Sequence, residues 1–453
     1  MADALASRLV AAGLAGGEER AKSELFARAF DALGPPTGDA RAWWVPGRIE
    51  FLGKHTDYAG GRSLLCAADR GFAVVSVPRT TARIHVIDAL TGKHVQAELS
   101  TELEAPSDHW SNYPLTVCRR LARNFPGSLR GLDLAFASDL PPAAGLSSSS
   151  ALIVSTFLAL ADANDLATRP EYGDAIRHDE DLAAYLGAVE NGSSFRRLAG
   201  DRGVGTLGGS QDHTAILCAR PGGLVQYGFA PVRHERDVPW PKEHVLVVAV
   251  SGVVAAKGAG AQASYNRASA TAAAALRFWR EATGSSAPTL AAALAESPNV
   301  MAKLKRLAEG RGDLPVPLEA LLARVQQLRD ELDIVVAAGD ALERGDLARL
   351  GTLVDMSQAN AERLLRNQVP ETVSLARGAR ELGAVAASAF GAGFGGSVYA
   401  LVRESDAEQF RIRWTERYVT DFPARRHDAS FFITHAGPPA TQLLSRKGAD
   451  TTS

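Results

Sequence analysis

The sequence predicts a globular α+β protein of two or three domains. Its 453 residues are 46% hydrophobic and 22% charged, which is ample material for cores of that size. Strand-like alternation is concentrated before residue 140, whereas residues 266–367 are rich in alanine and leucine at helical spacing. Helices and sheets are therefore both expected.

The individual elements follow from hydrophobic periodicity. Four segments have the alternation or the β-branched content of strands: 71–77, 82–88, 131–140 and 244–251. Apolar residues at helical spacing mark 2–33, 152–166, 179–191 and several helices within 266–367. Gly34, Pro35 and Pro36 end the first helical stretch. The prolines of 231–241 indicate a domain junction, and residues 440–453 look like a frayed terminus.

Charge and cysteine content exclude several classes of protein. With 49 Lys and Arg against 51 Asp and Glu, the formal net charge of −2 creates no overall field for nucleic acid or an anionic membrane. Any anion site must be local. Cys66, Cys118 and Cys218 fit neither a disulfide framework nor a zinc site, so we expect a reducing compartment, the cytoplasm. We find no signal-peptide pattern at the N-terminus and no apolar run of about 20 residues, so no membrane span is expected.

Residues 47–61, GRIEFLGKHTDYAGG, concentrate polar chemistry between glycines. They contain Arg48, Glu50, Lys54, His55 and Asp57. One interpretation is structural, because glycines mark turns and charged side chains usually lie at the surface. The other interpretation is a binding or catalytic site, and the residue types alone leave both open.

A second motif predicts a phosphate-binding loop. The strand at 131–140 runs into PPAAGLSSSSAL, and an apolar helix follows. This order directs several backbone N–H groups and the positive end of a helix dipole at one place, which favours an anion. A flexible Gly/Ser linker would not be enclosed by a patterned strand and an apolar helix. The loop at 145–149 is therefore expected to hold phosphate.

Two other glycine patterns do not carry the function that they suggest. Gly53-Lys54-His55 lacks both the upstream glycine and the following Ser or Thr of a Walker A loop. The G-x-G-x-x-G at 391–396 is followed by a predicted strand, whereas a dinucleotide-binding fingerprint must open a helix.

Three motifs together resemble the GHMP small-molecule kinases, and galactokinases in particular. Residues 47–61 resemble the family wording G-R-V-N-L-I-G-E-H-T-D-Y-N-G-G, and residues 145–149 resemble the phosphate loop G-L-S-S-S. Residues 387–401 resemble the third motif, a glycine-rich loop between helix and strand that closes over phosphate and sugar. The motifs occur in the family's order, and the resemblance spans roughly residues 25–435.

The resemblance implies a two-domain α+β GHMP kinase fold. An N-terminal mixed α/β domain, residues 1–230, would carry the sugar signature and the phosphate loop. A C-terminal ferredoxin-like domain, residues 231–453, would complete an active site between the two. The implied partners are a small-molecule sugar and ATP, with no nucleic acid and no membrane, and the implied state is a monomer or weak homodimer.

The implied activity is transfer of phosphate from ATP to the anomeric hydroxyl of a galactose-like sugar, with Mg²⁺ and without a covalent intermediate. Such a reaction needs positioning and charge stabilisation, since negative charge spreads over the transferred group. The resemblance assigns catalysis to Arg48 and the base Asp212, and the metal to Ser149 and Glu190. It assigns ATP binding to Trp110, Gly145, Leu146, Ser147, Ser148, Ser149, Gly393 and Gly395. Sugar binding falls to Lys54, His55, Asp57 and Tyr265.

The local wording departs from the family at several positions. Glu50 stands where the family has Asn, and Gln211 and His213 replace Met and Gln around Asp212. The gap from Glu190 to the next motif is longer than usual, filled by the basic segment GSSFRRLAGDRG. Without the family, Asp212 would be an ordinary acidic loop residue and Trp110 a core residue. His213 is expected to be structural, because the ten histidines show no ligand spacing.

Lys54 is the departure that bears on the substrate, since the family has Glu there. An ammonium only donates hydrogen bonds whereas a carboxylate accepts them, so Lys54 cannot make the same sugar contact. Either the site favours a modified or acidic sugar such as galacturonate, or Lys54 turns away and a neutral hexose binds. Two further alternatives are a non-catalytic sugar and ATP sensor, disfavoured by Arg48 and Asp212, and a kinase for a non-sugar alcohol, disfavoured by H-T-D-Y.

Overall fold

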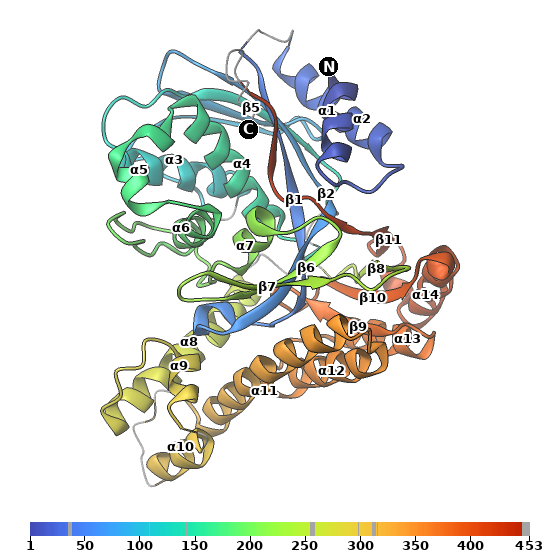
Figure 1. Cartoon of the computed structure of the whole chain (residues 1–453). Helices are drawn as coiled ribbons and strands as arrows, with labels where there is room; N and C mark the ends of the chain where they lie inside the picture. The colour runs from blue at the N-terminus through green and yellow to red at the C-terminus, as the bar shows by residue number, and fades with distance from the viewer. Residues whose placement is uncertain are drawn as a thin grey trace.

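Two β-sheets with helices packed on them make up the protein (Figure 1). The computed structural model describes residues 1–34, 39–107, 109–141, 144–253, 259–297, 299–309, 314 and 316–445. Within these ranges, no helix combines the length and the apolarity that crossing a bilayer requires.

The helices have the following bounds: α1 Ala2–Ala11, α2 Glu19–Leu33, α3 Asn112–Asn124, α4 Ser148–Ala163, α5 Pro170–Ala175, α6 Asp179–Asn191, α7 Gln211–Cys218, α8 Ala259–Thr283, α9 Leu290–Ala295, α10 Val300–Ala308, α11 Leu318–Glu343, α12 Leu347–Asn360, α13 Pro370–Glu381 and α14 Ala407–Asp421. The strands are β1 Arg41–Leu52, β2 Arg62–Pro78, β3 Arg83–Asp88, β4 His94–Glu98, β5 Leu132–Ser138, β6 Gly223–Gly228, β7 Arg233–Pro239, β8 His244–Val250, β9 Ala386–Phe390, β10 Ser397–Arg403, β11 Ser430–Thr434, β12 Ala436–Gly437 and β13 Thr441–Leu444.

The central strands of the larger sheet are buried on both faces. Its main path runs β13-β1-β2-β5-β3-β4, with β6 and β12 also paired to β2, and β7 paired to β6. Because side chains alternate across a strand, Trp43 and Val45 of β1 join one core while Ala42 and Trp44 join another. Figure 1 shows α1 and α2 on one side of this sheet and α3 to α6 on the other. This double cover explains why β1 is buried along its whole length.

The smaller sheet has the ferredoxin-like arrangement that the resemblance predicts. Its order is β11-β8-β10-β9, all antiparallel, with helices between β8 and β9 and α14 between β10 and β11. Val245, Val247 and Ala249 pack with α13 and α14, whereas Leu246 and Val248 face the core of the larger sheet. The alternation in β8 thus joins the two halves of the molecule.

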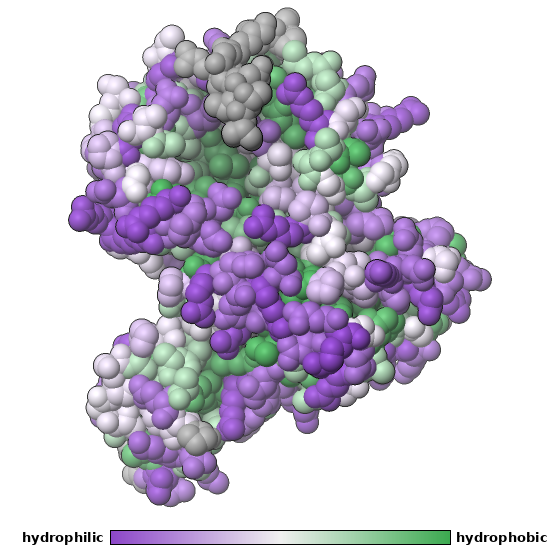
Figure 2. All heavy atoms as spheres, viewed as in Figure 1, coloured by the Kyte–Doolittle hydropathy of each residue, from purple (hydrophilic) through white to green (hydrophobic). Residues whose placement is uncertain are grey.

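Helices α8 to α11 form a projecting lobe with its own core, which includes Phe278, Trp279, Leu304 and Leu321 (Figure 1). Hydrophilic residues cover most of the face in Figure 2, and hydrophobic ones gather mainly in its hollows. This distribution is expected of a surface in contact with water.

Most predicted elements are present, but three expectations differ from the structure. The predicted junction at 231–241 contains β7, which pairs with β6, so the boundary between residues 230 and 231 falls inside one sheet. The terminus predicted to be frayed contains β13, which pairs with β1 and buries Leu443; residues 446–453 lie outside the described residues. The glycine-rich stretch at 391–396 joins strands β9 and β10 instead of a helix and a strand. Short edge strands gain their stability from a partner strand, which sequence periodicity does not reveal.

Asp69 of β2 fastens the end of the smaller sheet to the larger one. It is buried and accepts hydrogen bonds from Thr434 Oγ1 at 2.5 Å and from the backbone N–H of His435 at 3.0 Å. The His435 ring nitrogen Nδ1 lies 3.1 Å from the same carboxylate. Burial alone would raise the pKa of Asp69, but these bonds together with the charge of Lys22 hold it below its ordinary value. The Asp69 hydrogen bond raises the pKa of His435.

These shifts predict a pH dependence of stability. The lowered Asp69 pKa contributes stability above the ordinary value of 3.8, which is lost as the pH falls through the folded value. The raised pKa of His435 contributes stability that is fully present below its ordinary value of 6.5. This stability is lost as the pH rises through the pKa of His435 in the folded protein. We expect His435→Gln to lower the melting temperature by about 1–2 °C near pH 5.5 and by less near pH 8.5.

Thermal unfolding followed by circular dichroism at both pH values measures this effect. His427→Gln, which changes an exposed histidine of the same region, is the control and should have no effect at either pH. An equal loss for His435→Gln at both pH values would show that the imidazole charge does not contribute.

Candidate active site

A cavity of about 400 Å³ lies where loops from both halves of the chain meet. Its lining includes Arg48, Glu50, His55, Asp57, Trp110, Tyr113, Gly145, Ser147, Ser148, Ser149, Ser150, Glu190, Thr206, Gln211, Asp212, His213, Tyr265, Gly391, Ala392, Gly393 and Phe394. Most of the residues singled out in the sequence thus surround one space.

A larger hollow of about 530 Å³ lies between the α9 region and the β6–β7 pair. Its charged groups include Arg62 and Arg233, which both donate to Glu235. Of the sugar-signature residues it touches only Gly60 and Gly61, so it does not compete as the catalytic site.

Arg48 and Asp212 form an ion pair at the centre of the smaller, motif-lined cavity. Arg48 Nε donates to Asp212 Oδ1 at 2.6 Å, and its Nη1 donates to the Gly145 carbonyl at 2.5 Å. The Ser147 hydroxyl donates to the second oxygen of Asp212. Burial alone would raise the pKa of Asp212, but the Arg48 charge and the two side-chain hydrogen bonds hold it below its ordinary value. Asp212 is therefore a carboxylate at neutral pH and can accept a proton or a hydrogen bond.

The loop before α4 presents a helix N-terminus to this carboxylate. Gly145 has φ of +70° and Ser147 has φ of +59°, so the chain turns sharply before α4 begins at Ser148. The first N–H groups of a helix have no partner within the helix, and they carry partial positive charge. The Leu146 side chain is buried, while its carbonyl accepts from the Arg48 backbone N–H at 3.1 Å. The loop is thus clamped by the strand that carries Arg48.

Glu190, in the last turn of α6, borders the cavity beside the helix N-terminus. Its Oε2 accepts from Ser150 Oγ at 2.9 Å, and its Oε1 lies 3.5 Å from Thr206 Oγ1. His213 Nε2 lies 3.2 Å from Oε2 without hydrogen-bond geometry. The buried His213 ring makes no hydrogen bond among the described residues. A carboxylate and hydroxyl oxygens are ligands that a hard cation such as Mg²⁺ accepts.

The serine beside Glu190 is not the one that the resemblance selects. Ser149 lines the cavity and its side chain is hydrogen-bonded to Tyr113, whereas Ser150 contacts the carboxylate. The run of four serines, 147–150, was the available signal, but a run does not reveal which hydroxyl faces Glu190. No cluster of three or more His, Cys, Asp or Glu with metal-site geometry occurs among the residues described.

His55, Asp57 and Tyr265 form a wall on the opposite side. Burial lowers the pKa of His55 to about 4, helped by the Arg324 charge, so the imidazole is neutral. Its Nε2 lies 3.1 Å from the Ala392 carbonyl, which only accepts, so this nitrogen carries the proton. Its Nδ1 then accepts from Tyr58 Oη at 2.8 Å. The Tyr265 ring lies 5.2 Å from the imidazole, centroid to centroid, and Asp57 Oδ2 accepts from the Gln211 backbone N–H at 3.2 Å.

Lys54 does not face the cavity. Its ammonium is 1% exposed and donates to Ser357 Oγ at 3.0 Å and Ser388 Oγ at 2.8 Å, in the C-terminal half. The Lys54 backbone N–H donates to Glu331 Oε1, which also accepts from Ser357. The expectation that Lys54 contacts the sugar is therefore corrected: a buried ammonium needs acceptors, and it finds them behind the signature loop.

Glu50 lines the cavity in a way that sequence reasoning did not assign. It is 3% exposed, and its Oε2 accepts from Gln211 Nε2 at 2.7 Å. Burial raises the pKa of Glu50 to about 7, an effect that the charges of Arg48 and Lys54 reduce. The unusual Glu in place of Asn was the only sequence signal.

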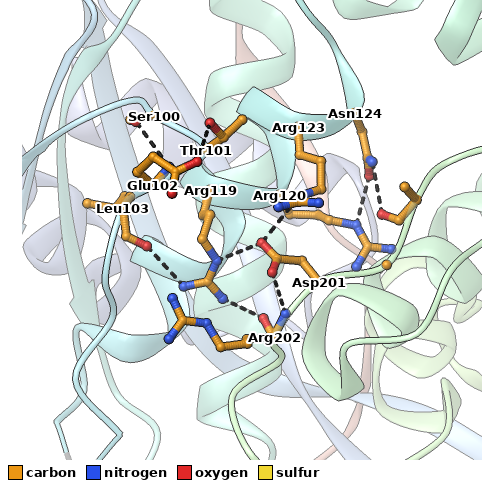
Figure 3. A network of polar contacts seen from close by, with 12 residues as sticks. Ser100, Thr101, Glu102, Leu103, Arg119, Arg120, Arg123, Asn124, Asp201 and Arg202 are labelled. Carbon is orange, nitrogen blue, oxygen red and sulfur yellow. Dashed lines mark hydrogen bonds and ion pairs between the residues drawn. The ribbon is translucent and has the colours of Figure 1, made fainter.

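The far end of the cavity is lined by Trp110 and Tyr113, at the start of α3. The same helix fixes the inserted segment 192–203, as Figure 3 shows for part of the network. Arg119 Nε donates to Asp201 Oδ2 at 2.8 Å. Arg120 Nη2 donates to the Ser193 carbonyl at 2.5 Å. The insertion is thus held against the helix by its backbone carbonyls and Asp201.

The glycine-rich loop closes the cavity from the C-terminal half. Gly393 lines the cavity, whereas Gly395 is not among the lining residues. Asn367 supports this loop, since its carbonyl accepts from the Phe394 N–H at 2.6 Å. A Cβ at Gly393 would approach that carbonyl to 2.4 Å, so only glycine fits.

Comparison with known proteins identifies relatives over most of the chain. Three family models match: the galactokinase galactose-binding signature at residues 24–77, the GHMP kinases N terminal domain at 112–194 and the GHMP kinases C terminal model at 340–420. A galactokinase of a Roseiflexus species is 30% identical over 83% of this chain and 86% of its own length. A galactokinase of Chloroflexus aurantiacus is 30% identical over 85% and 89%.

The fold also matches solved structures. The crystal structure of Lactococcus lactis galactokinase complexed with galactose superposes with a TM-score of 0.75 at 22% identity, covering 91% of this chain and 97% of that one. A mevalonate kinase from Methanococcus jannaschii gives a TM-score of 0.53 at 13% identity, covering 88% of this chain and 99% of its own. These structural likenesses concern the fold.

The position of Lys54 predicts that its loss affects stability more than substrate choice. Lys54→Met leaves the buried hydroxyl oxygens of Ser357 and Ser388 without the ammonium that donates to them, so we expect the free energy of unfolding to fall by about 2–4 kcal/mol. The ratio of kcat/KM for galactose to that for galacturonate should change by less than about threefold.

Denaturant unfolding and sugar kinetics measure the two effects. Lys242→Met, at an exposed lysine, is the control and should change stability by less than about 0.5 kcal/mol. Unchanged stability with altered sugar preference would restore Lys54 to the sugar site.

Proposed function

The chain belongs to the galactokinase family of GHMP kinases, and from that premise we propose that it transfers the γ-phosphate of ATP to the anomeric hydroxyl of galactose. It is a galactose-type sugar kinase. The observation that carries the proposal is Asp212, an ionised carboxylate held by Arg48 and Ser147 beside the open N-terminus of α4. The Asp212 carboxylate, which can accept a proton, thus lies next to the N-terminus of α4, which favours phosphate.

In the proposed reaction, Asp212 accepts the proton of the attacking hydroxyl or orients that hydroxyl. Arg48 keeps the carboxylate ionised, and its guanidinium stabilises negative charge that develops on the attacking oxygen. The N–H groups of Ser147 and of the start of α4, with the Ser148 hydroxyl, hold the phosphates, while the Ser147 hydroxyl donates to Asp212. Phosphoryl transfer depends mostly on such positioning, so no covalent intermediate is required.

ATP is the phosphate donor, and Mg²⁺ is the proposed cofactor. Glu190 would hold the ion together with one serine hydroxyl. This serine is either Ser150, which contacts Glu190, or Ser149, which the resemblance suggests. When bound, Mg²⁺ neutralises charge on the phosphates. Trp110 and Tyr113 provide an aromatic surface at the far end of the cavity, suited to the nucleotide base.

Several observations favour a neutral sugar over an acidic one. Lys54 faces away from the cavity, while Glu50, Asp57, Glu190 and Asp212 line it. A carboxylate on the sugar would be repelled by the ionised Asp212 and would not meet the Lys54 ammonium, which raises the free energy of binding. Galacturonate is therefore disfavoured. The intact Arg48–Asp212 pair also argues against a sensor without activity.

An ATP-consumption assay with a sugar panel tests the function. Galactose should give the highest kcat/KM, with galacturonate, arabinose and fucose lower, and the product should be the sugar 1-phosphate. No ATP consumption with any sugar, despite sugar and ATP binding, would favour the sensor. The predicted cytoplasmic location and the predicted monomer or weak homodimer stay predictions.

Asp212→Asn should reduce kcat by about 10²–10⁴-fold, because the amide keeps the shape but cannot accept the proton. The ATP dissociation constant should change by less than about threefold, since Asp212 has no proposed contact with the nucleotide. Steady-state kinetics and nucleotide titration measure both. Asp237→Asn, at an exposed carboxylate, is the control. Retention of more than about a tenth of kcat would exclude Asp212 as the base.

Alanine substitutions distinguish the two serines proposed for the metal. Ser150→Ala removes the hydroxyl that contacts Glu190, so the Mg²⁺ concentration for half-maximal rate should rise by about tenfold or more. Ser149→Ala should raise it by less than about threefold. Rates measured over a range of free Mg²⁺ decide between them, and the reverse order would assign the role to Ser149.

A further inference from the structure

Glu50 has one carboxylate oxygen that the protein leaves without a partner. Oε2 accepts from Gln211 Nε2 at 2.7 Å, but Oε1 is buried and makes no hydrogen bond among the described residues. The side chain is 3% exposed and lines the cavity. Buried polar atoms in folded proteins almost always have partners, so an orphaned oxygen on a cavity wall indicates a donor that arrives with a ligand.

Neighbouring cations do not provide that donor. Arg48 comes from the same strand, but its Nε and Nη1 bond to Asp212 and Gly145. The Lys54 ammonium bonds to Ser357 and Ser388 instead. The charges of Arg48 and Lys54 reduce the cost of burying the Glu50 carboxylate, but neither side chain donates a hydrogen bond to Oε1.

The location of Glu50 restricts what the donor is. Gln211 binds Glu50 through its side chain and Asp57 through its backbone N–H, and it directly precedes Asp212 in α7. Glu50 therefore belongs to the same wall as the proposed base and the residues of the sugar signature. A group that reaches Oε1 therefore lies next to Asp57 and Asp212, the residues that the proposed function assigns to the phosphate acceptor.

We propose that Glu50 determines specificity by accepting a hydrogen bond from one hydroxyl of the bound sugar, other than the hydroxyl that is phosphorylated. This inference rests on the proposed sugar kinase function and adds a contact to it. A site built to bond a hydroxyl rejects an analogue that lacks it, because the buried acceptor is then left unpaired. Glu50 therefore selects a neutral sugar that carries a donor at this position.

The test measures sugar binding to the full chain by calorimetry without nucleotide, using galactose and its 2-, 3-, 4- and 6-deoxy analogues. In the wild-type protein, the analogue that lacks the hydroxyl bound by Glu50 should bind roughly tenfold to a hundredfold more weakly than galactose. In Glu50→Gln, which keeps the shape but removes the charge, galactose should bind roughly threefold to thirtyfold more weakly. The penalty for that one analogue should shrink, while the penalties for the others stay the same.

Glu50→Ala is the second variant, since it removes the acceptor completely, and it should reduce the penalty for the same analogue to less than about threefold. Glu235→Gln is the control, because Glu235 is a partly buried carboxylate that lines the larger hollow and not this cavity. It should keep the wild-type pattern of penalties. Circular dichroism verifies that each variant is folded.

The outcomes separate this inference from the function on which it rests. If galactose binds and is phosphorylated but all penalties are equal in wild type and in both Glu50 variants, the inference is wrong and the proposed function stands. If neither galactose nor an analogue binds to the wild-type protein, both fail. A change in one penalty confined to the Glu50 variants supports the contact and identifies the hydroxyl.

Discussion

The ion pair between Arg48 and Asp212 is the interaction on which the rest of the site depends. It joins β1 to α7, and through the Gly145 carbonyl and the Ser147 hydroxyl it also joins both to the loop before α4. A buried guanidinium is unfavourable unless its charge is paired and its N–H groups are bonded. The three segments must therefore come together for the fold to be stable, and the same requirement sets a carboxylate beside a phosphate-binding helix end.

A second buried polar group supports the signature loop from behind. Glu331 of α11 accepts hydrogen bonds from the backbone N–H groups of Gly53 and Lys54. The hydroxyl oxygens of Ser357 and Ser388 accept hydrogen bonds from the Lys54 ammonium. These contacts determine the path of the chain just before His55. Residues 50–54 thus place opposite charges in different surroundings. The Lys54 ammonium points into the C-terminal half, and the Glu50 carboxylate lines the cavity. The cavity is thus lined by the carboxylate and not by the ammonium.

Sequence reasoning predicted the features that depend on local pattern. The strand, loop and helix around Gly145 carry their own signals, so this loop could be expected, whereas its place beside Arg48 was implied by the family resemblance. The direction of Lys54, the contact of Ser150 with Glu190 and the orphaned Glu50 oxygen could not be expected, because each depends on a partner distant in sequence. The same reason applies to β7 and β13, whose stability comes from pairing with β6 and β1.

The two halves of the chain contribute differently to the site. Arg48, Asp212, Glu190 and the serines before and within α4 all come from elements of the larger sheet and its helices. The C-terminal half provides Tyr265, the glycine-rich loop and the support from Glu331 and Asn367. Since Glu331 and Asn367 act on the backbone at 53–54 and 394, substitutions there can move the sugar wall without touching the catalytic pair. The sugar wall is therefore supported separately from the Arg48–Asp212 pair.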